Sequence, residues 1–279
     1  MVFPEISEGE GPVLETAKTI LEDEFFDVLE VSSVKDPSVR RELASLMRTS
    51  GVIPVFCAGG NIIRRNADLN ALQSSDRGEA MAFVKQLVDE ATSLEAKTFV
   101  LCSGPDPGKA HREAAMSALA SSLIEISDYA GKEMTISLES FDREVDKRRL
   151  IGPTSEAVNL IQGVKRDSTN VGLTIDLSHL PLLGERASIS LKKAKKVLAH
   201  THIGNCLPRA DAHPRFGVPN GCNGIREVRE FIQTLASIGY LKKYPAIVSF
   251  EVKPSPGESP EAVIAGSKRV LNAAMRGFK

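Results

Sequence analysis

Short apolar runs that alternate with amphipathic helical segments constrain the fold of this chain more than any other feature. The apolar runs occupy residues 25–31, 52–58, 97–102, 134–139, 170–176, 197–202 and 246–252, and residues 1–6 are compatible with a further strand. Helical patterns occupy residues 13–23, 38–50, 77–95, 109–130, 154–166, 186–197, 224–238 and 259–275. Strands that alternate with helices in this way pair in parallel. About eight such units predict an α/β fold, a single (β/α)8 barrel that forms one domain over residues 1–279.

The composition is that of an ordinary globular protein, with 42% hydrophobic and 25% charged residues. The net charge of -1 provides no attraction to nucleic acid or to an anionic membrane. No apolar run approaches the ~18–20 residues that a membrane span requires, and the N-terminus lacks a signal-like segment. The four cysteines are far apart without a CxxC pair, which is typical of free thiols in a reducing compartment. We therefore expect a cytoplasmic protein that binds neither nucleic acid nor membranes.

Three apolar runs alternate with polar side chains and end on a carboxylate: Glu139, Asp176 and Glu251. A fourth run ends on His202, which shares its face of the strand with His200. The carboxyl ends of the strands meet at one mouth of a barrel, so these groups are expected to converge there. Three carboxylates and an imidazole suit one divalent cation such as Mn, Mg, Co or Zn. Without a cation, three carboxylates so close together would repel one another. The alternative is that each acid caps a helix or pairs with a lysine.

Further polar residues follow the same strand ends. His179 comes three residues after Asp176, and Asp211 and His213 are spaced so that both can face one centre. His179, Asp211 and His213 could hold a second cation or bind substrate hydroxyls around a single one. The planar guanidinium of Arg215 could bind a substrate oxygen. His200 is expected to be buried one step below His202. The charged segment after Glu139 adds three candidates for the mouth of the barrel: Asp142, Arg143 and Lys147.

At these residues the chain resembles the xylose isomerase-like TIM-barrel superfamily, which includes sugar isomerases, ketose 3-epimerases, inosose dehydratases and endonuclease IV. The matching pieces cover about half the chain: Glu139 in SLES, Asp176 and His179 in TIDLSH, His202 in THIGN, Asp211 and His213 in DAH, and Glu251 in SFE. The resemblance implies that Glu139, Asp176, His202 and Glu251 are metal ligands. It also implies that Glu139 and Glu251 move the substrate proton and that His179 binds substrate or a second metal.

Together these features predict a metal-dependent isomerase or epimerase, manganese being one candidate metal, that transfers a proton α to the carbonyl of a sugar or oxo-sugar through an enediolate. Glu139, Glu251 and His179 are the expected catalytic residues. The expected substrate-binding residues are His179, Asp211, His213 and Arg215. The alternative is a metal-dependent lyase, because DAHPRFGVPNG and FDREVDK resemble the subunits that cleave C-glycosides of 3-oxo sugars.

Two further hypotheses fit the sequence less well. An abasic-site endonuclease needs additional histidines from the early strands, and residues 25–31, 52–58 and 97–102 contain none. A non-catalytic barrel subunit has no need for clustered carboxylates. The sequence leaves open the substrate, the identity and number of the metals, and whether the protein forms a homo-oligomer.

Overall fold

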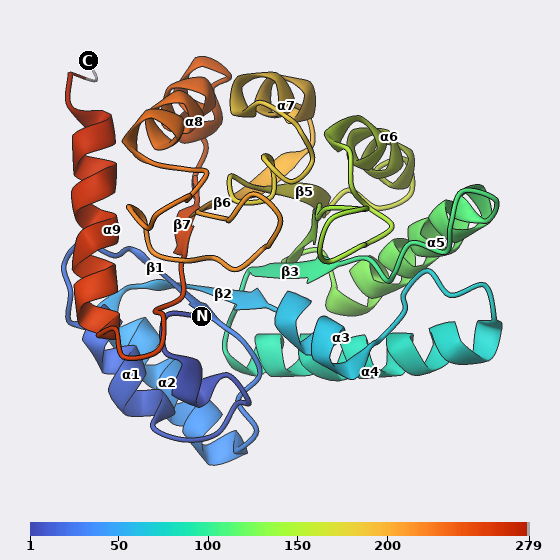
Figure 1. The fold of residues 1–279 in the computed structure, drawn as a ribbon. Helices are drawn as coiled ribbons and strands as arrows, with labels where there is room; N and C mark the ends of the chain where they lie inside the picture. Colours follow the sequence, from blue (N-terminus) through green and yellow to red (C-terminus); the bar gives the residue numbers. More distant parts are fainter. Residues whose placement is uncertain (278–279) are drawn as a thin grey trace. The chain divides into compact units, whose positions relative to one another are not determined.

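The computed structural model describes residues 1–277, in which seven β-strands and nine α-helices alternate (Figure 1). The strands are β1 (Val28–Val31), β2 (Ile53–Cys57), β3 (Thr98–Cys102), β4 (Thr135–Glu139), β5 (Val171–Asp176), β6 (Leu198–Gly204) and β7 (Val248–Glu251). The helices are α1 (Val13–Leu21), α2 (Pro37–Ser50), α3 (Gly59–Arg65), α4 (Ser74–Ser93), α5 (Arg112–Ala130), α6 (Thr154–Val164), α7 (Ala187–Ala194), α8 (Ile225–Ser237) and α9 (Pro260–Met275). Two 3-10 helices lie at Pro4–Ile6 and Tyr240–Lys242.

The strands form a sheet whose order follows the chain from β1 to β7. Neighbouring strands are parallel in the pairs β1–β2, β2–β3, β3–β4, β5–β6 and β6–β7. This arrangement confirms the predicted α/β fold with parallel strands. In the C-terminal unit it brings the carboxyl ends of β5, β6 and β7 to the same edge.

The expectation of an eighth strand within residues 1–6 is wrong. Pro4 opens the 3-10 helix Pro4–Ile6, and the amide of Gly9 donates to the carbonyl of Ile6 over 2.9 Å. Proline has no N–H to donate to a neighbouring strand, so this segment turns instead of pairing. Gly9 adopts a positive φ of 77°, which completes the turn at little cost for a glycine. Helix α3 was not expected from the sequence.

The chain forms two compact units. The N-terminal unit comprises residues 5–139 and 160–172, and the C-terminal unit comprises residues 1–4, 140–159 and the chain from Leu173 onward. The prediction of one domain over the whole chain stays a prediction.

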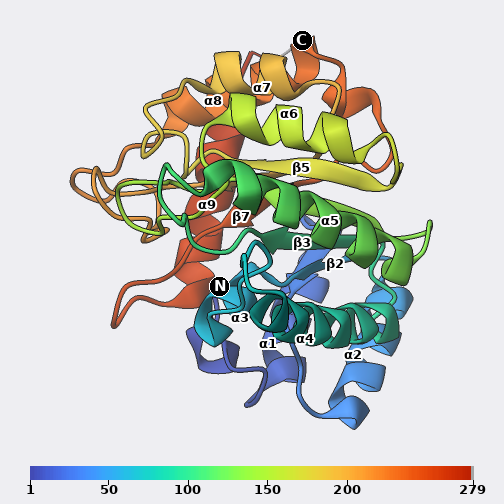
Figure 2. The ribbon, with the colours of Figure 1, turned by 90° about the vertical axis from the view of Figure 1, so that its right-hand side faces the viewer.

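In the N-terminal unit, α2 packs against α1 and α4, and α4 packs against α5 (Figure 2). The rings of Phe56 on β2 and Phe99 on β3 stack with their centroids 5.4 Å apart, and both are fully buried. Burial of large aromatic rings of this kind contributes strongly to the stability of a core.

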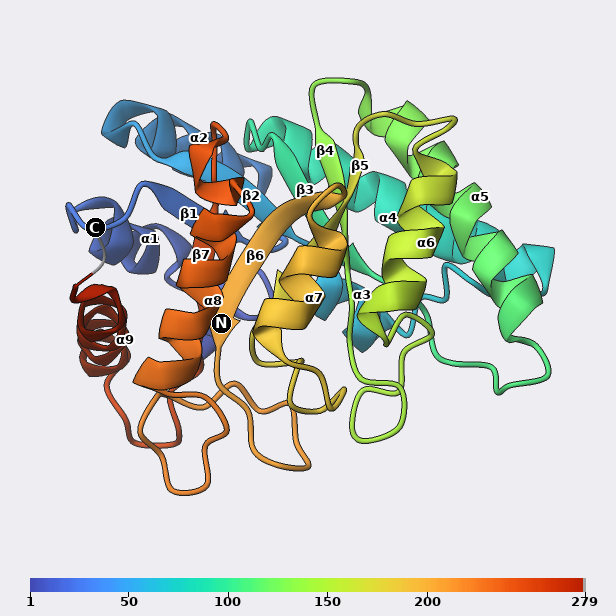
Figure 3. The same cartoon turned by 90° about the horizontal axis from the view of Figure 1, so that it is seen from above.

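In the C-terminal unit, α8 packs against α7 and α9 (Figure 3). The buried face of α8 includes Val228, Phe231, Ile232 and Leu235, a spacing that places apolar residues on one side of a helix. The loops that follow β5, β6 and β7 all belong to this unit.

Local capping explains several helix boundaries. The carboxylate of Asp36 accepts from the amide of Ser38 over 2.7 Å, and Pro37 occupies the first turn of α2. Gly51 ends α2 in the left-handed conformation, which a residue with a side chain rarely adopts. None of the helices in residues 1–277 combines the length and the apolar character needed to cross a membrane.

Candidate metal centre

The turn after β5 brings Asp176 and His179 to the same place. Asp176 ends the strand, and its Oδ1 accepts from the amide of Ser178 over 2.8 Å while its Oδ2 accepts from the Ser178 hydroxyl. These bonds form an Asx-type turn, in which a short carboxylate reverses its own backbone. As a result His179 Nε2 lies 3.4 Å from Asp176 Oδ2. The predicted pairing of these two residues is therefore present, and Ser178, which was not singled out from the sequence, positions the carboxylate.

The ends of β6 and β7 add an imidazole and a second carboxylate. His202 lies next to Asp176 in the register of β5 and β6. Its Nδ1 is 3.0 Å from Oε2 of Glu251, the last residue of β7. One ligand atom from each of Asp176, His202 and Glu251 lies within 4.8 Å of the others. Three of the four predicted metal ligands thus meet within the C-terminal unit.

The loop after β6 supplies Asp211 and His213. His213 Nε2 lies 2.9 Å from Asp211 Oδ1, and His179 Nε2 lies 3.3 Å from Asp211 Oδ2. Asp176, His179 and His213 each offer a ligand atom within 4.8 Å of the other two. His213 has a positive φ of 48°, and its carbonyl accepts from the amide of Lys253 over 2.7 Å. The segment after β7 therefore holds this loop against the cluster.

Two asparagines fix the base of the same loop. The Asn223 amide group donates to the carbonyls of Leu177 and Gly204, in both cases over 3.0 Å. The Asn223 backbone amide donates to Asn205 Oδ1 over 2.8 Å. A Cβ at Gly221 would lie only 2.5 Å from Asn205 Nδ2, so this position requires glycine. Only their position at the two ends of a long loop could have pointed to these residues from the sequence.

The orientation of the His179 ring follows from its backbone partner. Nδ1 of His179 lies 2.8 Å from the carbonyl oxygen of Ser140, and a carbonyl can only accept. Nδ1 therefore carries the proton, and Nε2 faces the carboxylates of Asp176 and Asp211. The ring of Phe141 lies against His179 with a centroid distance of 4.2 Å. A neutral imidazole in this tautomer presents a lone pair to two carboxylates, an arrangement that calls for a cation between them.

Glu139 is the last residue of β4 and belongs to the N-terminal unit, where its side chain is buried. It directly precedes Ser140, whose carbonyl accepts from His179. Its role as the fourth ligand stays a prediction.

Burial and neighbouring charges together set the charge state of the cluster. Burial, together with the negative charge of Glu251, raises the pKa of Asp176 to about 6 against the opposing effect of His179. Burial also opposes ionisation of Glu251, but the charges of His213 and His202 outweigh it and hold the pKa of Glu251 below its ordinary value. Positive charge beside these carboxylates thus favours their ionised form.

The neighbouring carboxylates shift the pKa of an imidazole in this cluster upward. Burial lowers the pKa of His213, but the carboxylates of Glu251, Asp211 and Asp176 outweigh it and raise the pKa to about 9. Burial likewise disfavours the ionised form of Asp211, and His179 and His213 together bring its pKa below the ordinary value. The raised pKa of His213 means that its protonated imidazole balances part of the carboxylate charge, and a divalent cation would take over this role.

The donor set fits a divalent cation. Adjacent ligands around an octahedral cation with bonds of about 2.1 Å lie about 3.0 Å apart, which is comparable to the His202–Glu251 contact. Among the described residues, Glu251 Oε2 and both oxygens of Asp211 are buried without a hydrogen bond of acceptable geometry. Imidazole nitrogens and carboxylate oxygens that approach closely without aligned hydrogen bonds are expected around a common positive ion.

Other residues predicted for the mouth have different surroundings. Arg215 Nε donates to Glu258 over 2.5 Å, so its guanidinium is engaged in an ion pair. The carboxylate of Asp142 accepts from three backbone amides, and Arg143 pairs with Glu156. Of the three charged candidates after Glu139, Lys147 contacts the cluster within the described residues. Its Nζ donates to the carbonyl of Asp211 over 3.0 Å.

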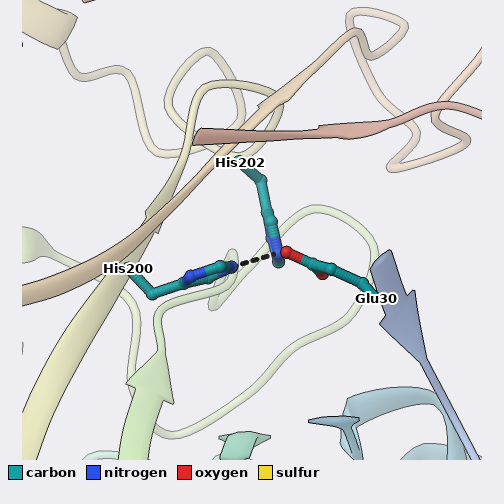
Figure 4. Close-up of side chains that lie close together, drawn as sticks. All are labelled: Glu30, His200 and His202. Carbon is teal, nitrogen blue, oxygen red and sulfur yellow. Dashed lines mark hydrogen bonds between the residues drawn. The ribbon is translucent and has the colours of Figure 1, made fainter. Parts of the chain in front are cut away.

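His200 precedes His202 by two residues on β6. It is buried, as expected, and its Nε2 lies 3.1 Å from Nε2 of His202 (Figure 4). Glu30, which Figure 4 also labels, belongs to the N-terminal unit, where it accepts from the thiol of Cys57. Because His202 turns Nδ1 towards Glu251, its Nε2 is left to interact with His200.

Replacing His200 with leucine is expected to weaken Mn²⁺ binding by about 10- to 100-fold, because the ring of His202 loses the partner that holds it. His200→Gln retains a hydrogen-bonding group at similar reach and should preserve most of the affinity. Isothermal titration of metal-free protein with Mn²⁺ measures the effect. Thr201→Val changes the opposite face of the strand, where Thr201 donates to Ile247, and is the matched control. Equal affinity of the leucine variant and the native protein would contradict a positioning role for His200.

Comparisons with known proteins agree with the fold. A D-tagatose 3-epimerase-like protein superimposes with a TM-score of 0.77 at 19% identity, covering 98% of both chains. D-psicose 3-epimerase from Clostridium cellulolyticum H10, solved with D-tagatose, gives a TM-score of 0.69 at 18% identity over 96% of this chain and 92% of the other. The IOLI protein, solved with a bound zinc atom, gives a TM-score of 0.70 at 19% identity over 95% of this chain and 94% of the other.

Comparison with curated protein sequences gives no match. The family model described as xylose isomerase-like TIM barrel matches residues 23–274, which include every strand of the structure. The chain therefore belongs to the xylose isomerase-like TIM barrel family.

Proposed function

We propose that this protein is a divalent-metal-dependent isomerase or epimerase that moves a proton α to the carbonyl of a sugar or oxo-sugar. The observation that carries the proposal is the cluster of Asp176, His202 and Glu251 at or near the C-terminal ends of three parallel strands, in which Asp176 and His202 are buried. The names of the similar structures, which include sugar epimerases, support the same reaction class.

Four side chains would hold the cation: Glu139, Asp176, His202 and Glu251. Asp176, His202 and Glu251 lie together in the C-terminal unit, and Glu139 immediately precedes the Ser140 carbonyl that fixes His179. A cation bound there would polarise a carbonyl or hydroxyl oxygen of the substrate and make the neighbouring C–H bond more acidic.

The carboxylates of Glu139 and Glu251 are proposed to remove and return the substrate proton. Glu251 suits this task because the neighbouring imidazoles keep it ionised in a buried site. Loss of the proton from the α-carbon leaves an enediolate, which accepts a proton on the same carbon in an epimerase or on the neighbouring carbon in an isomerase. A positioned base contributes typically about 10²- to 10⁴-fold to such a step.

His179 is proposed to assist this transfer, while Asp211 and His213 bind substrate hydroxyls. Phe141 and Ser140 fix the plane of the His179 ring, so its Nε2 points at a defined position beside Asp176. His179, Asp211 and His213 also form a donor set that could hold a second cation. Arg215 would bind substrate only after it leaves Glu258, with which it now pairs.

Hydrogen exchange tests this function across many sugars at once. Metal-loaded protein is incubated with a panel of ketoses and 3-oxo sugars in deuterated water, and deuterium at the α-carbon is measured by NMR. We expect exchange with at least one sugar, accompanied by conversion to its epimer or isomer. Absence of exchange with every member of the panel, from protein shown to contain metal, would contradict the proposal.

The second candidate is a metal-dependent lyase that acts on C-glycosides of 3-oxo sugars. The close approach of His179 and His213 to Asp211 favours it, because cleavage needs a proton donor besides the metal ligands. Release of the free aglycone from a 3-oxo C-glycoside, detected by chromatography, would support the lyase.

A further inference from the structure

Among the described residues, Arg149 carries a buried positive charge without an anionic partner. The residue is only 6% exposed, and Nε and Nη1 of its guanidinium are buried without a hydrogen-bond partner within residues 1–277. Arginine does not lose its proton in proteins, so the charge is not relieved by neutralisation. An unpaired buried charge is costly to keep, and the structure retains it.

The backbone around Arg149 is held rigidly. The amide of Arg149 donates to the carbonyl of Asp142 over 2.9 Å, and the amide of Phe141 donates to the carbonyl of Ile151 over the same distance. The side chain of Asp142 accepts three backbone amides of the intervening loop, over 2.7, 2.7 and 2.8 Å. Arg143 donates to the carbonyl of Leu150, directly beside Arg149. These hydrogen bonds tie the backbone together on both sides of Arg149.

The same loop contacts the candidate metal centre at two points. Phe141 lies against the ring of His179, and Lys147 Nζ donates to the carbonyl of Asp211. In return, the amide of Asp211 donates to Asp146 Oδ2 over 2.8 Å. The loop that carries Arg149 therefore borders the candidate metal centre.

We propose that Arg149 binds an oxyanion, and that this oxyanion is a phosphate or carboxylate group on the sugar bound at the metal centre. The planar guanidinium donates two parallel hydrogen bonds to such groups, which a neutral hydroxyl does not match. The identity of the ligand as a sugar rests on the proposed function, whereas the anion site itself does not.

Thermal unfolding with inorganic phosphate as the probe tests the anion site. Arg149→Met removes the charge and keeps an apolar chain of similar length, and Arg148→Met makes the same change at the exposed neighbouring residue. In phosphate-free buffer we expect Arg149→Met to melt higher than the native protein, because an unpaired buried charge has been removed. Arg148→Met should melt as the native protein does.

Phosphate should raise the melting temperature of the native protein and of Arg148→Met above that in chloride of equal ionic strength, but should not do so for Arg149→Met. Arg149→Lys, which keeps the charge without the planar guanidinium, should retain part of the rise in melting temperature with phosphate. If Arg149→Met melts lower than the native protein and phosphate acts equally on all variants, Arg149 is structural and the proposal is overturned. This measurement needs no turnover, so it is independent of the hydrogen-exchange test of the proposed function.

Calorimetric titration distinguishes an anion carried by the sugar from free phosphate. The native protein and Arg148→Met should bind a ketose 6-phosphate at least about tenfold more tightly than the same ketose without phosphate. Arg149→Met should lose this preference. Equal affinity of the native protein for both sugars would overturn the assignment of the anion to the substrate.

Discussion

Replacing Glu251 with glutamine is expected to lower kcat by about 10²- to 10⁴-fold, the usual contribution of a positioned base. Glutamine has the same size and keeps one oxygen towards His202, but its amide does not accept the substrate proton. Because Glu251 is held ionised by the imidazoles around it, the native carboxylate is ready to accept that proton. The measurement is deuterium incorporation at the α-carbon, followed at saturating sugar and metal.

Glu125→Gln is the matched control for this variant. Glu125 lies on α5, where its side chain is exposed and pairs with Lys85 over 2.7 Å. The control variant should retain native turnover. If Glu251→Gln keeps the native kcat with unchanged metal content, Glu251 does not transfer the substrate proton.

Replacing Asp176 with asparagine is expected to abolish most of the stabilisation that a cation confers. A cation present at about 100 times its dissociation constant stabilises a folded protein by about 2.7 kcal/mol. For a chain of this size that corresponds to a rise in melting temperature of about 5 °C. The native protein should show this rise when Mn²⁺ is added after treatment with chelator, and Asp176→Asn should not.

Asparagine is chosen because it can keep the turn after β5. Its oxygen can still accept from the amide of Ser178, and its amide group can donate to the Ser178 hydroxyl. Burial raises the pKa of Asp176, so the neutral side chain should not destabilise the metal-free protein. Asp89→Asn, at an exposed residue that pairs with Tyr129, is the control. Native metal content in Asp176→Asn, measured by elemental analysis, would exclude Asp176 as a ligand.

Most of the strands and helices were predictable because their signals are local. The predicted run 170–176 corresponds to β5, and 154–166 corresponds to α6. Alternation of apolar side chains and the turn residues between them are properties of a few neighbouring positions. Helix α3 was missed since it begins with Gly59 and Gly60, which are weak helix formers. Its residue Ile62 is completely buried, and the helix packs against β3, which lies more than 30 residues further along the chain.

The sequence alone determined that Asp176, His202 and Glu251 would lie near one another, because each lies at or near the C-terminal end of a strand and the ends of parallel strands share one edge. Only the tertiary structure decided which loop side chains join them. Arg215 pairs with Glu258, whereas Nε and Nη1 of Arg149 are buried without a hydrogen-bond partner among the described residues. The physical reason is that strand periodicity is a local property of the chain. The partner of a loop side chain, in contrast, depends on contacts between segments that are distant in sequence.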